Sequence, residues 1–174
     1  GQLLQFSDKI DEQIYKREDT VNYLDKVISE YISTALATPN LNVNISQALS
    51  SYYLMLVDIE RISDYAVNMN HQATKRLQGD MTISEIEIIE HMKKLCEDMK
   101  YDLDDVEEAE RKDDVIDSLV SSWREAQIQA LKQKKCSSEV SMMLSRIFTD
   151  FERINDHALN VSQELDKITF EIPD

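Results

Sequence analysis

One stretch of this chain occurs twice, and this repeat constrains the fold more than any other feature. Residues 58–70 read DIERISDYAVNMN and residues 150–162 read DFERINDHALNVS, so that seven of thirteen positions are identical. An internal repeat indicates that one supersecondary unit is present twice. The identical positions include acidic, arginine and asparagine residues, whereas a repeat kept only for packing would preserve its apolar positions. The pattern therefore indicates a duplicated polar function as well as a duplicated fold.

Residues that break helices are rare in this chain. Among its 174 residues are two Gly and two Pro, and of these only Pro39 and Gly79 lie in the interior. Such a composition is typical of long helices and argues against turn-rich β folds. Apolar residues at helical spacing, with capping residues between them, predict five helices. These are expected over about residues 7–37, 45–77, 82–95, 113–133 and 138–168, with an extended tail at 169–174.

Each copy of the repeat is expected to belong to a pair of antiparallel helices. Residues 21–24 align with residues 116–119, at matching places in the helix that precedes each repeated stretch. The second unit has an added helix in front. We therefore predict an all-α fold of two related helical-bundle units, which cover residues 1–78 and 79–174.

Charge and cysteine usage exclude several classes of function. The formal net charge is −15, which repels phosphate backbones, so we expect no nucleic-acid partner. The same charge argues against a basic patch that binds an anionic membrane surface. Cys96 and Cys136 match no metal-ligand spacing, and free thiols in a reducing cytoplasm are expected.

The repeated stretches carry oxygen-bearing side chains at intervals of four residues, which places them on one face of a helix. These candidate ligands are Glu60, Asp64 and Asn68 in the first copy, and Glu152, Asp156 and Asn160 in the second. Two carboxylates at this spacing repel each other unless a proton or a cation intervenes. Carboxylate and amide oxygens without thiolates suit a hard or borderline divalent or trivalent cation. The repeat therefore predicts a metal site in each unit.

One helix supplies too few oxygen ligands for a metal ion, so the preceding helix of each unit must contribute. In the second unit this helix offers Asp113 and Asp117, again four residues apart. In the first unit Glu18 and Asn22 stand at the matching places. Four carboxylates from two facing helices can hold more than one metal ion.

Other interpretations remain open at this point. With 34 acidic residues in the chain, acid pairs at this spacing also arise from composition alone, so a helical adaptor without metal is one alternative. A carboxylate-bridged di-iron enzyme is another, but no His of this chain has Glu three positions earlier, as such enzymes require. Arg61 and Arg153 are expected to pair with acids on adjacent helices, and His71 and His157 to be polar surface residues.

The segments ERISDYAVN and ERINDHALN resemble the signature of the PhoU family of phosphate-uptake regulators. Residues 23–31, YLDKVISEY, also resemble the PhoU domain that follows the membrane domain of bacterial sodium/phosphate cotransporters. The resemblance implies two three-helix bundles side by side and a non-catalytic role in phosphate transport and phosphate homeostasis. It also implies iron or zinc ions, in multinuclear clusters, bound on the surface by acidic residues.

By this resemblance, Glu60, Asp64, Glu152 and Asp156 match the final-helix motif, and Asp113, Asp117 and Glu18 match the partner helix. Asn22 replaces an acid of the family pattern, so the first site is expected to be weaker or empty. By the same resemblance, the first unit is expected to lack most of its leading helix, either because the sequence begins inside the domain or because another chain completes the bundle. The apolar surface expected there would allow self-association as a homodimer. The expected location is the cytoplasm, at the inner face of the membrane. The expected partner is a phosphate transporter or the protein's own membrane domain.

Overall fold

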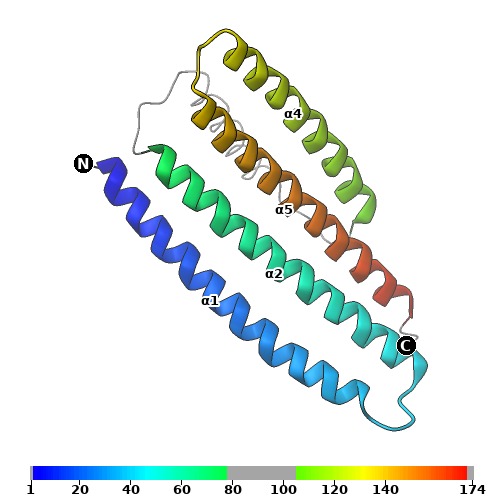
Figure 1. Ribbon diagram of the computed structural model, residues 1–174. Helices are drawn as coiled ribbons and strands as arrows, with labels where there is room; N and C mark the ends of the chain where they lie inside the picture. The colour runs from blue at the N-terminus through cyan, green and yellow to red at the C-terminus, as the bar shows by residue number, and fades with distance from the viewer. Residues whose placement is uncertain (1, 78–104, 172–174) are drawn as a thin grey trace.

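The computed structural model describes residues 2–77 and 105–171, which form four long helices. They are α1 (Gln2–Leu36), α2 (Val43–Leu77), α4 (Val106–Lys132) and α5 (Ser138–Glu171). Figure 1 shows them side by side in the order α1, α2, α5, α4, with each helix antiparallel to its neighbour. The predicted all-α fold of long antiparallel helices is confirmed. The helix expected from residue 82 lies outside the described residues.

Side-chain caps fix where three of the helices begin. The Asn42 side chain accepts a hydrogen bond from the Asn44 backbone N–H at 2.8 Å, and the Ser137 hydroxyl accepts one from Val140 at 3.2 Å. The sequence offers two candidate caps at each of these places, Asn42 or Asn44 and Ser137 or Ser138, and the structure uses the first of each. Asp105 caps α4 by accepting from the Glu108 backbone N–H at 2.9 Å. Helix α4 therefore begins about seven residues before the predicted start.

The C-terminal end of α5 also differs from the prediction. Residues 169–171 continue the helix, whereas an extended tail was expected from residue 169. The first helix-breaking residue is Pro173, and the residue before a proline is disfavoured in helical conformation. None of the described helices is long and apolar enough to cross a membrane.

The two halves of the chain meet along α2 and α5, the helices that carry the repeated stretches. Contact between these two helices is the most extensive of the described helix pairs. Met55 on α2 packs with Val161 and Ile168 on α5. The Asp58 carboxylate also crosses this interface and contacts His157 on α5. The repeated stretches thus lie at the centre of the helical layer.

The main apolar core lies in the second half, between α4 and α5. Seven buried side chains form it: Ile116, Val120, Trp123, Leu144, Ile147, Phe148 and Phe151. The positions that correspond to Trp123, Leu144 and Phe151 through the repeat are Ile28, Tyr52 and Ile59 in the first half. These three are between 37% and 42% exposed, whereas the second-half residues are between 3% and 7% exposed. These three apolar positions are thus buried in the second half and exposed in the first, although Met55, the counterpart of Ile147, is buried.

Candidate metal centre

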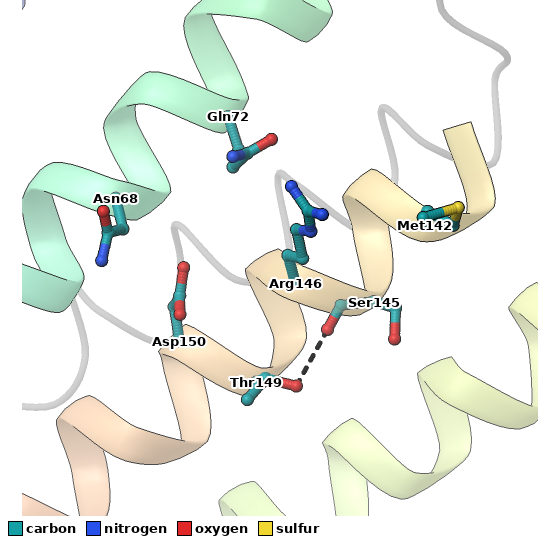
Figure 2. A pocket seen from close by; sticks show the side chains of 7 residues that line it. All are labelled: Asn68, Gln72, Met142, Ser145, Arg146, Thr149 and Asp150. Atoms are coloured by element: carbon teal, nitrogen blue, oxygen red, sulfur yellow. Dashed lines mark hydrogen bonds between the residues drawn. The ribbon is translucent and has the colours of Figure 1, made fainter. Parts of the chain in front are cut away.

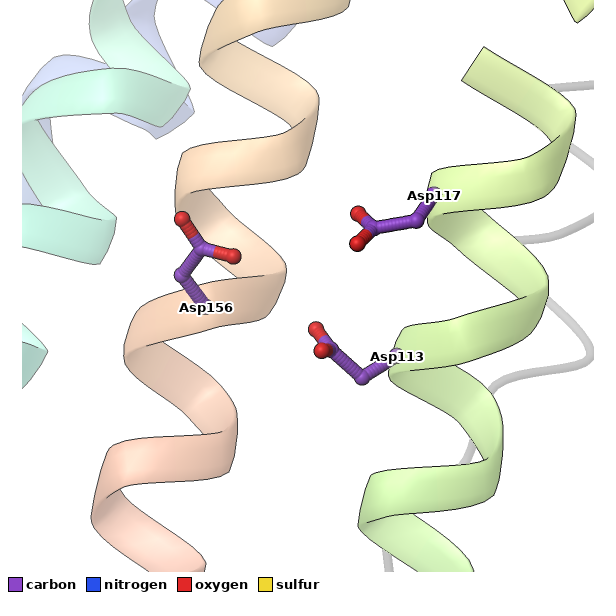
Figure 3. Close-up of side chains that lie close together, drawn as sticks. All are labelled: Asp113, Asp117 and Asp156. Carbon is purple, nitrogen blue, oxygen red and sulfur yellow. The ribbon is translucent and has the colours of Figure 1, made fainter. Parts of the chain in front are cut away.

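Three aspartates converge between α4 and α5. Asp113 and Asp117 lie one turn apart on α4, and Asp156 on α5 points toward both (Figure 3). One carboxylate oxygen from each lies within 4.8 Å of the others. Across a bound cation, opposite oxygen ligands are separated by about 4–5 Å, twice the usual metal–oxygen distance. Within residues 2–77 and 105–171, no other three His, Cys, Asp or Glu side chains bring their ligand atoms this close together.

The surroundings of the centre disfavour its negative charge. Burial raises the pKa of Asp113, and the carboxylates of Asp117, Asp156 and Asp114 raise it further. A hydrogen bond from Asn155 acts in the opposite direction and lowers the pKa of Asp113. The net pKa of Asp113 is above the ordinary value for an aspartate, first because the carboxyl is partly buried and second because other carboxylates lie close to it. A cation at this point would relieve that repulsion.

Asn155 is a site residue that the sequence analysis missed. Its side chain is 3% exposed, and its Nδ2 donates a hydrogen bond to Oδ1 of Asp113. Its own Oδ1 is buried and has no hydrogen-bond partner among the described residues. Buried polar atoms are rarely left without a partner, and they often mark functional sites. Asn155 therefore holds Asp113 toward the other two aspartates, as outer-shell residues do for metal ligands.

Glu152, a predicted ligand, does not join the three aspartates. Its Oε2 accepts a hydrogen bond at 2.5 Å from Nη2 of Arg124 on α4, and the two side chains form an ion pair. Arg153 lies against Asp156 at 3.2 Å, on the same helix. That second pair is more than 40% exposed on both sides, and exposed pairs contribute little to stability. The predicted four-carboxylate set is thus reduced to three by a neighbouring arginine.

The predicted ligands of the first half do not assemble into a comparable group. Arg61 lies 3.7 Å from both the Glu60 and the Asp64 carboxylates, on their own helix. Arg61 and Arg153 were predicted to reach acids on adjacent helices, but among the described residues the ion pairs of both are with acids of their own helices. On α1, Glu18 is half-buried and Asn22 is exposed, and neither joins a three-residue group in the described part of the chain. Asn22 lacks the charge that Asp117 brings to the second half.

The two predicted asparagine ligands lie at the α2–α5 interface instead. Asn160 donates a hydrogen bond to Oδ1 of Asp58 at 3.2 Å, and Nδ1 of His157 lies 2.7 Å from the same oxygen. The His157 ring stacks on Tyr65 with 5.8 Å between ring centroids. His157 is thus a half-buried contact between the two halves, not the surface residue that we predicted.

Asp150, the counterpart of Asp58 in the second copy, lines a polar groove of about 470 Å³ between α2 and α5. Asn68 also lines this groove (Figure 2), and it is not part of the group of three aspartates. Burial raises the pKa of Asp150, and the nearby Arg146 guanidinium lowers it. The groove is open to solvent and is lined by Met142 and by six residues that carry amides, hydroxyls or charges.

We expect Asp113→Asn to stabilise the metal-free protein at neutral pH. A carboxyl whose pKa is raised by folding stabilises the folded state only while it is protonated, and that contribution is lost as the pH rises through the folded pKa. Removing one of two like charges a turn apart is worth a few tenths of a kcal/mol, or an increase of about 1–2 °C in Tm. The gain should shrink as the pH falls toward the ordinary Asp pKa. Thermal unfolding with a chelator present, from pH 7 downward, measures it, and a lower Tm at pH 7 would contradict it.

Comparison with known proteins places the chain in a family. The PhoU domain matches residues 3–73 and again residues 86–165. A protein of Deinococcus radiodurans, named only as uncharacterized, is 23% identical over 164 residues, which are 87% of this chain and 58% of that protein. This chain therefore spans a little more than half of that relative's length. PhoU homolog 1 of Thermotoga maritima, named as an accessory protein of a phosphate-specific transport system, is 22% identical over 165 residues, with 88% of this chain and 70% of that protein covered.

A solved structure shows the same fold. The crystal structure of PhoU from Pseudomonas aeruginosa matches with a TM-score of 0.78 and 17% sequence identity, over 94% of this chain and 83% of that chain. The duplicated motif, the layer of long antiparallel helices and the two PhoU-domain matches agree with one another. The chain belongs to the PhoU domain family.

Proposed function

We propose that this chain is a non-catalytic regulatory module of phosphate homeostasis that binds a metal cation through Asp113, Asp117 and Asp156. The observation that carries the metal assignment is the convergence of these three carboxylates from two helices. The phosphate role rests on membership in the PhoU family and on the printed name of the Thermotoga relative, an accessory protein of phosphate transport.

The donor set defines which cations we expect. Three carboxylates supply oxygen ligands and three negative charges, which suit a hard or borderline cation such as iron, manganese or zinc. Asp113 and Asp156 are half-buried and Asp117 is exposed, so solvent can complete the coordination shell. When bound, the cation would offset most of the negative charge of the aspartates and hold α4 against α5. Iron and zinc remain our first choices, as the family resemblance implies.

The partner that we propose is a phosphate transporter at the cytoplasmic face of the membrane. This transporter is either a separate protein or a membrane domain in the same polypeptide, as in sodium/phosphate cotransporters. The exposed apolar face formed by Ile28, Tyr52 and Ile59 supports a second contact, with another copy of the chain. Sedimentation measurements of the isolated chain distinguish monomer from dimer.

Metal titration tests the proposal most directly. The metal-free protein should bind one ion of Mn²⁺, Fe²⁺ or Zn²⁺ per chain, as counted by equilibrium dialysis. At a free metal concentration of about 100 Kd, binding stabilises the folded state by about 2.7 kcal/mol. For a chain of this size that raises Tm by roughly 5–10 °C. A chelator should reverse the shift. A protein that retains none of the three metals and melts at the same temperature throughout would disprove the metal assignment.

A further inference from the structure

Arg124 is placed so that it competes with a metal ion for Glu152. The Arg124 guanidinium on α4 donates to Oε2 of Glu152 at 2.5 Å and to the Thr149 hydroxyl at 3.1 Å, both on α5. The side chains of Arg124 and Glu152 are 32% and 28% exposed, so this pair is better shielded from water than the Arg153–Asp156 pair. A shielded, charge-assisted pair is stronger than an exposed one.

The Arg124–Glu152 pair lies on the same surface as the three aspartates. Glu152 precedes Asp156 by four residues, so the two carboxylates lie on one face of α5, a turn apart. On α4, Arg124 follows Asp117 by seven residues, which is two turns along the same face. The α4–α5 surface therefore carries four neighbouring carboxylates. Three belong to the aspartates, and the fourth, that of Glu152, is paired with Arg124.

We propose that Arg124 limits the metal centre to three carboxylates and one divalent cation by keeping Glu152 out of the coordination shell. This inference rests on the proposed metal site. With Arg124 in place, the three remaining carboxylates carry three negative charges, enough for one divalent ion but too few to balance two. Without Arg124, four carboxylates carry four negative charges, which two divalent cations neutralise. Arg124 thus sets the number of metal ions bound.

The first half of the chain shows that this arginine is not part of the shared motif. The alignment of residues 21–24 with 116–119 places Ser29 at the position of Arg124. The Ser29 hydroxyl donates to Asp25 on its own helix, at 3.5 Å. A guanidinium that reaches the neighbouring helix is therefore present at this position only in the half that gathers three aspartates.

Arg124→Gln tests the inference, with Arg111→Gln as the matched control. Arg111 is also on α4, and its pair with Glu107 is exposed, at 3.8 Å. We expect the number of Mn²⁺ ions bound per chain to rise from one to two in Arg124→Gln and to stay at one in Arg111→Gln. Two neighbouring Mn²⁺ ions should also give an exchange-coupled electron paramagnetic resonance signal. Adding Glu152→Gln to Arg124→Gln should return the count to one.

A second measurement does not depend on removing Arg124. Glu152→Gln alone should leave Mn²⁺ affinity within about twofold of wild type, because Glu152 does not bind the ion in this arrangement. By contrast, the loss of a residue that supports the metal ligands usually costs tenfold or more in affinity. A large loss of affinity in this variant, or a single ion bound by folded Arg124→Gln, would overturn the inference. If wild type binds one ion in those cases, the proposed function still holds. If wild type binds none, both fail.

Discussion

Asp156→Asn is expected to weaken metal binding by at least about 100-fold, because it removes the single ligand that α5 contributes. Outer-shell substitutions already cost about 10–100-fold in metal affinity, so the loss of a ligand should cost at least as much. Asp113 and Asp117 would remain, but both lie on α4, so the ion could no longer bridge two helices. Isothermal titration of the metal-free protein with Mn²⁺ or Zn²⁺ measures the change.

The repeat supplies the matched control for this prediction. Asp64 occupies in the first copy the position that Asp156 occupies in the second, and it lies 3.7 Å from Arg61 on its own helix. Asp64→Asn should therefore leave both affinity and stoichiometry unchanged. Equal losses of metal affinity in Asp156→Asn and Asp64→Asn would show that both halves bind metal. That result would agree with the repeated motif but contradict a site confined to Asp113, Asp117 and Asp156.

The repeated stretch predicted the fold because helical periodicity and helix breakers are local properties of the sequence. The bounds of α2 and the cap at Ser137 follow from residues close to them in the chain. The start of α4 was misplaced because the stretch from 102 to 114 contains no Gly or Pro, and its start is set by the Asp105 side chain alone. A cap formed by one of many aspartates gives no distinct signal in so acidic a segment.

The candidate metal centre was predictable only in part. Spacing along one helix places Asp113 with Asp117 on a common face, and the repeat indicates that Asp156 faces them. Spacing could not show that Arg124, 28 residues before Glu152 in the chain, would contact it across the α4–α5 interface. Asn155 did leave a signal: it replaces Ser63 of the first copy, immediately before the motif aspartate. The change from Ser63 to Asn155 between the two copies thus pointed to a site residue that the identical positions did not reveal.

The two halves therefore use the same acids in different ways. In α2, Arg61 lies 3.7 Å from both Glu60 and Asp64 and offsets part of their negative charge. In α5, Arg124 neutralises Glu152, while Asp156 faces two further aspartates. The packing also differs, because Trp123, Leu144 and Phe151 are buried in the second half. Their counterparts Ile28, Tyr52 and Ile59 are exposed in the first half. Duplication of the sequence thus gives one half suited to a metal ion and another with an uncovered apolar surface.

Phe151→Ala is expected to lower the free energy of unfolding by about 3–5 kcal/mol, because it removes a buried aromatic ring and leaves a cavity. Phe151 is 3% exposed, and the centroid of its ring lies 6.2 Å from the centroid of the Trp123 ring. The expected decrease in Tm is about 6–20 °C. Trp123 is the single tryptophan of the chain, so its fluorescence reports the unfolding of this core directly.

The control is Ile59→Ala, at the matching position of the first copy, where the side chain is 41% exposed. A partly exposed side chain contributes less apolar burial, so the loss there should stay below about 1 kcal/mol. A loss at Ile59 as large as that at Phe151 would mean that the apolar face of α1 and α2 is covered in solution. Repeating the unfolding experiment over a range of protein concentrations would then identify the cause, because a dimer unfolds at a temperature that rises with concentration, whereas a contact within one chain does not.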